Sequence, residues 1–276
     1  MSTPTWKSWR RIFRTARPAH KAMQGASRPV WLSAAEGPDA FPPAREALNE
    51  PNGLLAVGGS LSSDWLLSAY PKGIFPWYEE GQPILWWSPN PRAILRPEDL
   101  HVSRRLRRSR RRSRLRVTAD CAFDAVIRSC AAPRRHANAT WITPQMCSAY
   151  REMHALGWAH SFEAWRDDDL VGGLYGLAIG SVFFGESMFS KFTDSSKLAF
   201  VDAVEYLQTR SYELIDCQVW SGHLKSLGAK MMPRDDFLAE LTALCEPRRA
   251  PGSWRDDFER YRHRRGTRES AGGADK

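Results

Sequence analysis

The sequence predicts an α+β protein with a small N-terminal α/β domain and a larger C-terminal domain. Three observations favour this fold class. The chain has 276 residues, more than the roughly 100 to 200 residues of an average single domain. Apolar residues make up 42% of it and aromatic residues 11%, as in folded globular proteins. In the second half, β-rich runs bounded by Gly and Asp are followed by a helix, a strand and a helix.

Residues 1–29 are predicted to form a disordered basic extension. The first 35 residues contain seven Lys and Arg and no acidic residue. They lack the apolar core and the small-residue cleavage site of a secretory signal. No stretch approaches the roughly 18 consecutive apolar residues that predict a membrane span, so we expect no membrane partner.

Residues 30–100 are expected to form the small first domain. They are dense in Pro, Gly and Trp, which is typical of short elements joined by tight turns. Ser62 or Ser63 caps a helix that reads DWLLSAY, and Pro71 and Gly73 end it. The segment ILWWSP then reads as a strand.

Residues 101–249 contain the longer elements. The segment FDAVIRSC predicts a helix. A second helix begins at Thr143, a good cap, with Pro144 in the first turn, and it ends at Gly157. The runs SFEAWR, LVGGLYGLAIG and SVFFGESMFS then predict an antiparallel meander.

The last predicted elements are a helix capped near Asp194, a buried strand ELIDCQV and a helix around DFLAELTAL. This order of strands, helix, strand and helix is similar to that of N-acetyltransferase-like (GNAT) acyltransferases. Residues 250–276 are polar and are expected to form a loose tail.

The cysteines and histidines predict neither a disulfide scaffold nor a metal site. The five cysteines are odd in number and include no CxxC pair. The seven histidines show no HxxxH or Cys/His spacing that places two ligands on one face. We therefore expect a protein of the reducing cytoplasm without bound zinc.

The positive charge is concentrated in one run. Residues 104–116 read RRLRRSRRRSRLR, and these nine arginines account for the whole net charge of +9. A solvated loop or a localisation signal is one interpretation. The planar guanidinium also suits phosphate oxygens, which makes nucleic acid the leading partner. The expected phosphate-binding residues are Arg104, Arg105, Arg107, Arg108, Arg110, Arg111, Arg112 and Arg114.

Eight blocks together resemble the leucyl/phenylalanyl-tRNA-protein transferase family, and they span about residues 41 to 241. They are GLLAVGGSLS, YPKGIFPWY, PILWWSPNPRAIL, HVSRRLRR, TWITPQM, LVGGLYGLAIGSVFFGESMFS, LIDCQV and HLKSLGAKMMPRDDF. The resemblance implies a GNAT-like C-terminal domain and no metal or soluble cofactor. It also implies transfer of Leu, Phe or more weakly Met from aminoacyl-tRNA to an acceptor protein with N-terminal Arg or Lys, which marks that protein for N-degron degradation.

The strand LIDCQ holds the expected catalytic pair. Strand alternation predicts that Asp216 and Gln218 share one face and that Cys217 faces away. Buried polar groups need partners, so a purely structural pair is one interpretation. The resemblance implies instead that Asp216 and Gln218 are catalytic. Whether Asp216 takes a proton from the amine or anchors the acceptor's basic side chain stays open, and a nucleophilic Cys217 is disfavoured for want of a base.

The segment FFGESMFS reads as an ordinary core strand from its residues alone. By the resemblance, Phe183 and Met188 belong to the pocket for the transferred apolar side chain, with Glu186 and Ser190 at its polar rim. Most of the twelve tryptophans belong to cores or interfaces. The resemblance implies that Trp87, with Trp86 as its alternative, and Trp141 hold the 3′-terminal adenosine of tRNA.

Four positions depart from the family pattern, and two other functions compete. Asn90 stands where Asp is usual, Lys191 where Arg is common, and Ser221 with Gly222 replace the usual residues before His223. The runner-up function is an acetyltransferase that uses acetyl-coenzyme A, although the junction KFTDSSK lacks a glycine-rich pyrophosphate loop. A non-catalytic RNA-binding protein explains the arginine run but not the polar pair in LIDCQ. We expect a monomer.

Overall fold

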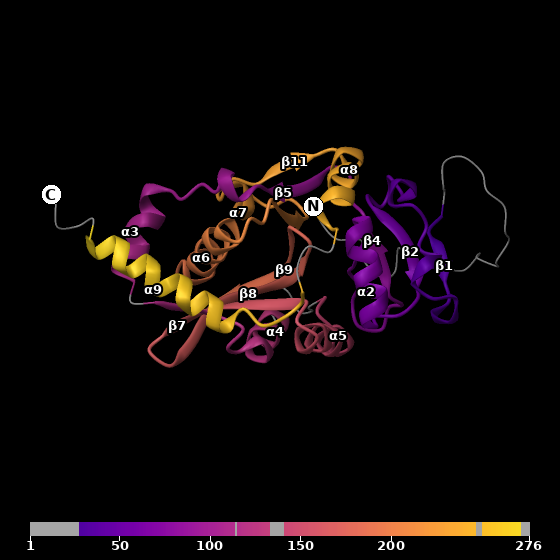
Figure 1. Ribbon diagram of the computed structural model, residues 1–276. Coiled ribbons are helices and arrows are strands. Elements are labelled where there is room, and N and C mark those ends of the chain that lie inside the picture. The colour runs from indigo at the N-terminus through magenta and orange to yellow at the C-terminus, as the bar shows by residue number, and fades with distance from the viewer. Residues whose placement is uncertain (1–27, 114, 133–140, 247–249, 272–276) are drawn as a thin grey trace.

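The computed structural model describes residues 28–113, 115–132, 141–246 and 250–271. Two sheets organise this part of the chain (Figure 1). A four-stranded sheet in the order β1-β2-β4-β3 lies at one end, and a seven-stranded sheet in the order β11-β5-β10-β9-β8-β7-β6 forms the body. The predicted α+β class is confirmed. The predicted extension over residues 1–29 lies almost wholly outside the described residues.

The first sheet packs its tryptophans into a small core. It contains β1 (Val30–Leu32), β2 (Leu54–Gly58), β3 (Phe75–Pro76) and β4 (Leu85–Trp87), and helix α2 (Ser63–Ala69) lies beside it. The predicted helix and strand in this segment are thus present. The ring of Phe41 contacts both Trp65 and Trp86 edge to face, with centroids 5.1 and 4.8 Å away. Such contacts stabilise a core beyond the apolar area that they bury.

The second sheet combines the predicted meander with a parallel pair. Strands β6 (Arg116–Ala119), β7 (Ala159–Arg166), β8 (Asp169–Ile179) and β9 (Val182–Ser190) are successive antiparallel neighbours. Helix α6 (Ser195–Thr209) then returns the chain to β10 (Leu214–Gln218), which pairs with β9 in parallel. Strand β11 (Lys230–Met232) completes the far edge.

Strand β5 (Arg92–Leu95) also belongs to the second sheet, where it pairs with β10 and β11. The sequence analysis assigns Arg92–Leu95 to the first domain, over residues 30–100. In the structure these residues belong to the second sheet, so the chain enters that sheet before residue 100.

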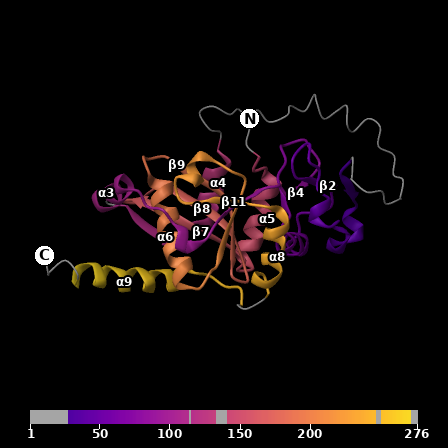
Figure 2. The ribbon, with the colours of Figure 1, turned by 90° about the horizontal axis from the view of Figure 1, so that it is seen from above.

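Helices cover both faces of the second sheet. Consecutive residues of β8 point to opposite faces of the sheet. A side chain added at Gly172 would contact α6, and one added at Gly173 would contact α4 (Phe123–Ala131), so these two helices lie on opposite faces. Helix α5 (Pro144–Ala155) lies on the α4 side, and α8 (Arg234–Leu244) packs beside the first domain (Figures 1 and 2). Thr143 caps α5 as predicted, because its hydroxyl accepts a hydrogen bond from the backbone N–H of Met146 at 3.2 Å. No described helix has the length and apolar character to cross a bilayer.

The C-terminal segment differs from the loose tail that the sequence predicts. It forms helix α9 (Arg255–Ala271), which begins after Trp254 and packs beside β6. Trp254 and Phe258 are buried, and the ring of Trp254 stacks on His160 with centroids 3.6 Å apart. Trp254 directly precedes the helix and Phe258 lies in its first turn, four residues later, and both rings contact Phe162 of β7. That spacing is the signal that the polar composition concealed.

Candidate active site

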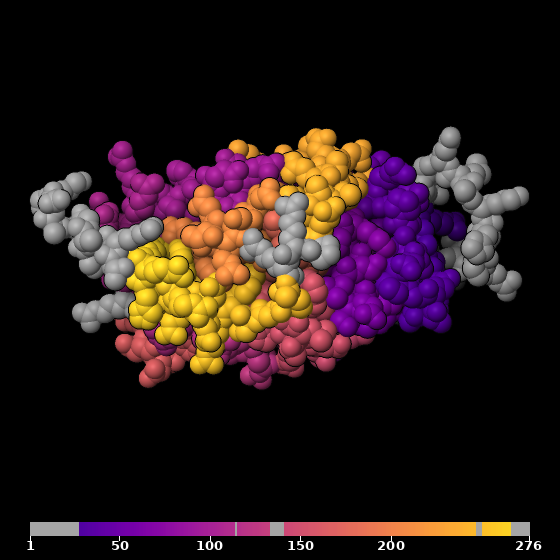
Figure 3. Space-filling view, in the orientation of Figure 1, coloured from indigo at the N-terminus to yellow at the C-terminus, as the bar shows by residue number. Residues whose placement is uncertain are grey.

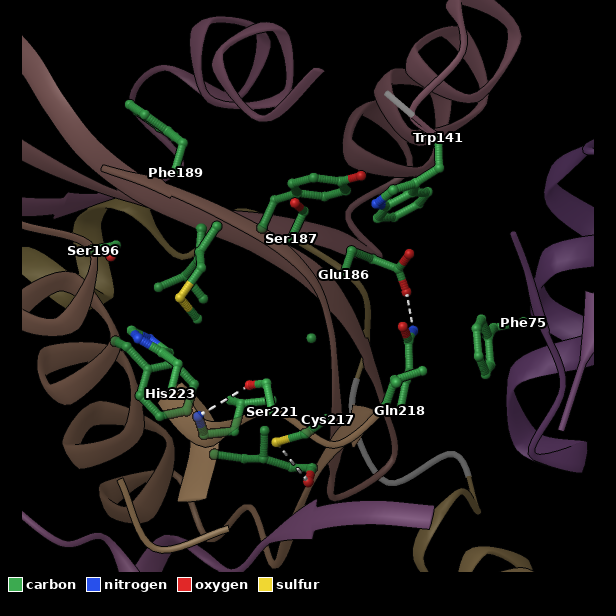
Figure 4. Close-up of a pocket in the computed structure, with 18 of the residues that line it drawn as sticks. Phe75, Trp141, Glu186, Ser187, Phe189, Ser196, Cys217, Gln218, Ser221 and His223 are labelled. Carbon is green, nitrogen blue, oxygen red and sulfur yellow. Dashed lines mark hydrogen bonds between the residues drawn. The ribbon is translucent and has the colours of Figure 1, made fainter. Parts of the chain in front are cut away.

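A pocket opens in the second sheet where its parallel strands β9 and β10 separate. Strand β9 pairs with β10 only from Val182 to Phe184, but it stays paired with β8 as far as Ser190. A pocket of about 530 Å³ fills the wedge between them (Figure 4). The lining residues are Phe75, Pro76, Trp77, Trp141, Leu174, Tyr175, residues 185–190, Ser196, Phe200, Ile215, Cys217, Gln218, Val219, Ser221, His223 and Leu224.

Two β-bulges shape the polar corner of this pocket. In β9, Gly185 and Ser187 pair with adjacent residues of β8, which leaves Glu186 as the extra residue. In β10, Asp216 and Gln218 pair with adjacent residues of β5, which leaves Cys217 extra, and Gln218 has a positive φ of 59°. A bulge redirects side chains at a sheet edge. Here Glu186 and Gln218 turn toward each other, and the Gln218 amide nitrogen donates to Glu186 Oε1 at 2.8 Å (Figure 4).

Glu186 is a buried carboxylate held by three donors. Besides Gln218, the hydroxyl of Tyr70 donates to its Oε1 at 2.7 Å and that of Tyr150 to its Oε2 at 2.9 Å. The two hydroxyl groups also contact each other. Burial raises the pKa of Glu186 to about 7, although all three donors favour the ionised form. The carboxylate therefore exchanges a proton readily at neutral pH.

Asp216 does not line the pocket. Its carboxylate forms a bidentate pair with the buried guanidinium of Arg92, Oδ1 to Nε at 2.8 Å and Oδ2 to Nη2 at 2.6 Å. The rings of Phe75 and Phe237 lie 4.7 and 4.8 Å from that guanidinium. Asp216 Oδ1 also accepts the backbone N–H of Gln218 at 2.8 Å. Both carboxylate oxygens are thus engaged within the protein.

The predicted alternation along β10 is wrong because of the bulge. Cys217 and Gln218 both line the pocket, whereas Asp216 turns to Arg92. Burial, with the charge of Asp216, raises the pKa of the Cys217 thiol well above its usual range. A protonated thiol is a poor nucleophile, so facing the pocket does not make Cys217 a nucleophile.

The expected pocket residues divide into two groups. Glu186, Met188 and Ser190 line the pocket, but Phe183 does not. Phe183 precedes the point where the strands separate; it pairs with Ile215 and is 1% exposed. The prediction of Phe183 as a lining residue is therefore wrong.

The tryptophans require a second correction. Trp141 lines the pocket, but Trp87 does not: it is buried in the first domain, and its indole N–H donates to the carbonyl oxygen of Trp77 at 2.6 Å. Its alternative, Trp86, is fully buried as well. Trp77 lines the pocket in their place. The motif GIFPWY contains it, and nothing in the spacing of the tryptophans distinguishes it from Trp86 or Trp87.

Two lining residues have an unsatisfied polar atom. Within the described chain, the buried hydroxyl of Tyr175 and Nε2 of His223 have no hydrogen-bond partner. Burial, then the charge of Lys197, lowers the pKa of His223, which favours a neutral imidazole. Unpaired buried polar atoms are costly, so these two atoms are candidates for contacts with a substrate.

The arginine run begins as helix α3 (Arg104–Arg112). The hydroxyl of Ser103 caps it, and Leu106 is its buried residue. Arg110 is committed inside the protein, where it pairs with Asp202 and Glu205 of α6. Six of the expected arginines are exposed: Arg104, Arg105, Arg107, Arg108, Arg111 and Arg112. Arg114 lies outside the described residues.

Helix α3 lies close to the pocket rim. Arg105 lies 3.5 Å from Asp194, the residue before α6, and Ser196 in the first turn of α6 lines the pocket. The cationic helix and the pocket are therefore neighbours. In the described parts of the chain, no cluster of three His, Cys, Asp or Glu residues is arranged to hold a metal ion.

Comparison with known proteins identifies the family. The family model for leucyl/phenylalanyl-tRNA protein transferase matches residues 94–242, and the model for the N-terminal domain of these proteins matches residues 59–90. The leucyl/phenylalanyl-tRNA–protein transferase of Pseudomonas syringae pv. syringae (strain B728a) is 58% identical over 197 residues, which cover 71% of this chain and 86% of that protein. This chain belongs to the leucyl/phenylalanyl-tRNA–protein transferase family.

Two further relatives are similar to this chain in sequence, and one solved structure aligns with part of it. The transferases of Stutzerimonas stutzeri (strain A1501) and Aromatoleum aromaticum are 55% and 53% identical; the matches cover 78% and 81% of this chain and 95% and 93% of those proteins. A GCN5-related N-acetyltransferase from Kribbella flavida aligns with a TM-score of 0.33 and 12% identity, over 60% of this chain and 58% of that one.

The residues that depart from the pattern of leucyl/phenylalanyl-tRNA–protein transferases make identifiable contacts in the structure. The side chain of Asn90 accepts the backbone N–H of Arg234 at 3.0 Å, which ties the β4–β5 connection to α8. Lys191 lies over the ring of Phe189, and Ser221 caps α7 (Gly222–Lys225) at the pocket wall. Helix α9 follows the residues that the family models match.

Proposed function

We propose that this protein transfers a leucyl or phenylalanyl group from charged tRNA to the α-amino group of a protein that begins with Arg or Lys. The observation that carries the proposal is an apolar pocket with the Glu186–Gln218 pair at its corner, in a chain of the transferase family. Methionine is a weaker donor side chain in this proposal, and the modified protein is marked for N-degron degradation.

The reaction needs little activation. The ester of aminoacyl-tRNA is already activated, and an α-amino group with a pKa of about 7.7 to 8.0 becomes neutral at pH 7 for roughly 1 kcal/mol. Holding the amine and the ester in attack geometry contributes on the order of 7 to 11 kcal/mol. A general base adds roughly a hundredfold to ten-thousandfold. The enzyme therefore acts mainly by positioning, without ATP or a cofactor.

Gln218 is proposed to position the attacking amine. Its amide nitrogen is committed to Glu186, which leaves its carbonyl oxygen to accept a hydrogen bond from the amine. The amine nitrogen bonds to the ester carbonyl carbon, and the bond from that carbon to the ribose oxygen breaks. Glu186, with its pKa raised to about 7, takes the proton that the amine loses and returns it to the departing oxygen.

Asp216 is proposed as a positioning residue, neither the base nor the anchor of the acceptor's side chain. Arg92 occupies both of its carboxylate oxygens, and Oδ1 also holds the backbone N–H of Gln218. This bond fixes the left-handed conformation that directs Gln218 into the pocket.

The apolar part of the pocket is proposed to hold the transferred side chain. Met188, Leu174 and Phe200 line it. An apolar pocket distinguishes one methylene by only about 1 to 3 kcal/mol, so it accepts Leu, Phe and some Met. Met188 has a flexible thioether that adapts to either shape.

The 3′ end of tRNA is proposed to stack on Trp77 and Trp141, with the exposed arginines of α3 on the phosphates behind it. Base stacking contributes roughly 1 to 3 kcal/mol per base, and it is indifferent to base identity. None of the five cysteines forms a disulfide, and we place the reaction in the reducing cytoplasm.

Acetyl-coenzyme A is a less suitable donor for this site. The helix that follows β9 begins at Ser195, and Asp194 precedes it with its carboxylate near Arg105. A carboxylate at that helix N-terminus repels a pyrophosphate, and no glycine-rich loop is present there.

The test is transfer of labelled leucine from Leu-tRNA to a peptide that begins with Arg. We expect label in this peptide and none in the same peptide with an acetylated or a glutamate N-terminus. Acetyl-coenzyme A, supplied without tRNA, should modify no peptide. Peptide acetylation would favour the acetyltransferase, and tight tRNA binding without transfer would favour a non-catalytic RNA-binding protein.

A further inference from the structure

A second groove lies at one edge of the second sheet, between the edge strand β6 and helix α9. It has a volume of about 190 Å³, and Arg116 and Thr118 of β6 face Arg255, Glu259 and Arg262 of α9 across it. Figure 3 shows α9, in yellow, exposed at the end of the molecule away from the indigo first domain. The aminoacyl pocket does not use these residues.

The three arginines of this groove have no acidic partner. Among the described residues, Arg116, Arg255 and Arg262 form no ion pair, whereas the neighbouring Arg110 and Arg265 both pair with acids of α6. Arg262 donates to the carbonyl oxygen of Val117 at 2.8 Å. The groove therefore brings three arginines together with one acidic residue, Glu259.

The electrostatics of Arg262 support this description. Burial lowers its pKa first, and the charges of Arg116 and Arg265 lower it further. Glu259, the acid that lines the groove, opposes this effect, and its carboxylate lies 3.9 Å from His263. Crowded like charges raise the free energy of the folded protein, and a bound anion would relieve that cost.

We propose that this groove binds a backbone phosphate of tRNA at a distance from the 3′ end. Fork-shaped guanidinium groups match phosphate oxygens, and three of them surround this groove. The inference rests on the transferase function proposed above, which already brings tRNA to the protein.

Continuity with α3 favours RNA over a small anion. Arg110 of α3 and Arg265 of α9 both bind Asp202 and Glu205, so the two helices meet over the same acids of α6. Both views of the ribbon place α3 and α9 at the same end of the molecule (Figures 1 and 2). A polyanion that crosses the exposed arginines of α3 therefore passes close to α9.

The test compares tRNA binding by the full-length protein with that of a groove variant carrying Arg116→Gln, Arg255→Gln and Arg262→Gln. Glutamine keeps a donor for the carbonyl of Val117. A control variant carries Arg45→Gln, Arg128→Gln and Arg151→Gln, which removes the same charge from exposed arginines outside the groove; Arg128 and Arg151 pair with Asp124. Binding of deacylated tRNA is measured by fluorescence anisotropy over a range of salt, and circular dichroism establishes that each variant folds.

We expect a slope of log affinity against log salt that is shallower by about 0.9 for the groove variant, since the groove binds one phosphate and each phosphate contact contributes about 0.9. Its affinity for tRNA near 0.1 M salt should fall about tenfold. The control variant should keep a slope close to that of the wild type. Equal slopes for the groove variant and the wild type would overturn the proposal.

A second arm separates the two sources of phosphate. If inorganic phosphate raises the wild-type melting temperature but the groove variant keeps the wild-type tRNA slope, the groove takes a free anion and the RNA assignment is wrong. Leucine transfer is measured on the same preparations. No transfer by the wild type would contradict the proposed function, whereas normal transfer with an unchanged tRNA slope contradicts only the groove.

Discussion

The pKa of Glu186 depends on both its burial and its hydrogen bonds. Three donors hold its carboxylate, two from tyrosines and one from Gln218, yet burial still raises its pKa to about 7. Without the donors the group would stay protonated to a higher pH, and without burial it would lie fully ionised below neutrality. Burial and the three hydrogen bonds together set the pKa of Glu186 to a value that suits proton exchange near pH 7.

A change of Glu186→Gln tests this role through pH. The acceptor amine ionises near 8 and Glu186 near 7, and both must lose a proton before reaction. Below pH 7, log kcat/KM for the peptide should therefore rise with a slope near 2 in the wild type and near 1 in the variant. Glu240→Gln, which changes a half-buried carboxylate paired with Arg96 outside the pocket, serves as the control and should keep the steeper slope. Identical slopes in the wild type and Glu186→Gln would remove Glu186 from the proton path.

At the scale of residues, the sequence predicts which side chains belong to the site better than it predicts how they are oriented. Glu186, Met188, Ser190, Gln218 and Trp141 all line one pocket, although about 80 positions separate the first from the last along the chain. The orientation of Asp216 was not predictable, because strand alternation assumes no bulge. A bulge depends on the register between neighbouring strands, which is set by tertiary pairing.

At the scale of elements, the site exists because two parallel strands separate. The sequence predicts β9, α6 and β10 individually, since each has a clear pattern and clear ends. It does not predict how far β9 and β10 run together, which is three residues. Because the two strands pair over only three residues, Phe183 is buried between them and the residues after Phe184 line the pocket.

The tryptophan assignment yields a prediction about two elements. Trp77 and Trp141 line the pocket, so Trp77→Ala and Trp141→Ala should raise KM for Leu-tRNA about tenfold and change the melting temperature little. Trp87 is buried, so Trp87→Ala should lower the free energy of unfolding by about 3 to 5 kcal/mol. Steady-state kinetics and urea unfolding measure both. A stable Trp87→Ala protein with impaired tRNA binding would reverse the assignment.

The C-terminal helix is expected to be necessary for stability. Truncation after Ala250 removes Trp254 and Phe258, which pack on Phe162 and Tyr206. Each buried aromatic side chain contributes about 3 to 5 kcal/mol, so the truncated chain should lose well over 5 kcal/mol.

Urea unfolding compares this truncation with one after Ala271, which should behave as the wild type. Equal midpoints for all three chains would show that α9 contributes nothing to the core. The sequence missed this helix because its charged residues mask the spacing of its two buried aromatics.

At the scale of the whole molecule, the two sheets share a site. Tyr70 follows α2 in the first domain, and its hydroxyl reaches Glu186 of the second sheet. One hydrophobic core also runs from the first domain to the face covered by α4 and α5, while a separate core lies under α6. The sequence predicts two domains, but their continuity depends on side chains far apart in the chain, which local patterns do not report.

The central claim is that Glu186 and Gln218, brought together where β9 and β10 separate, form one reacting unit. The most direct measurement is a double-mutant cycle of the single-turnover rate of leucine transfer, with Glu186→Gln, Gln218→Ala and the double variant at saturating substrates. We expect each single change to lower the rate at least a hundredfold, and the double change to lower it little further, because the two side chains share one hydrogen bond. Losses of tenfold or less in both single variants, with folding intact, would contradict the account.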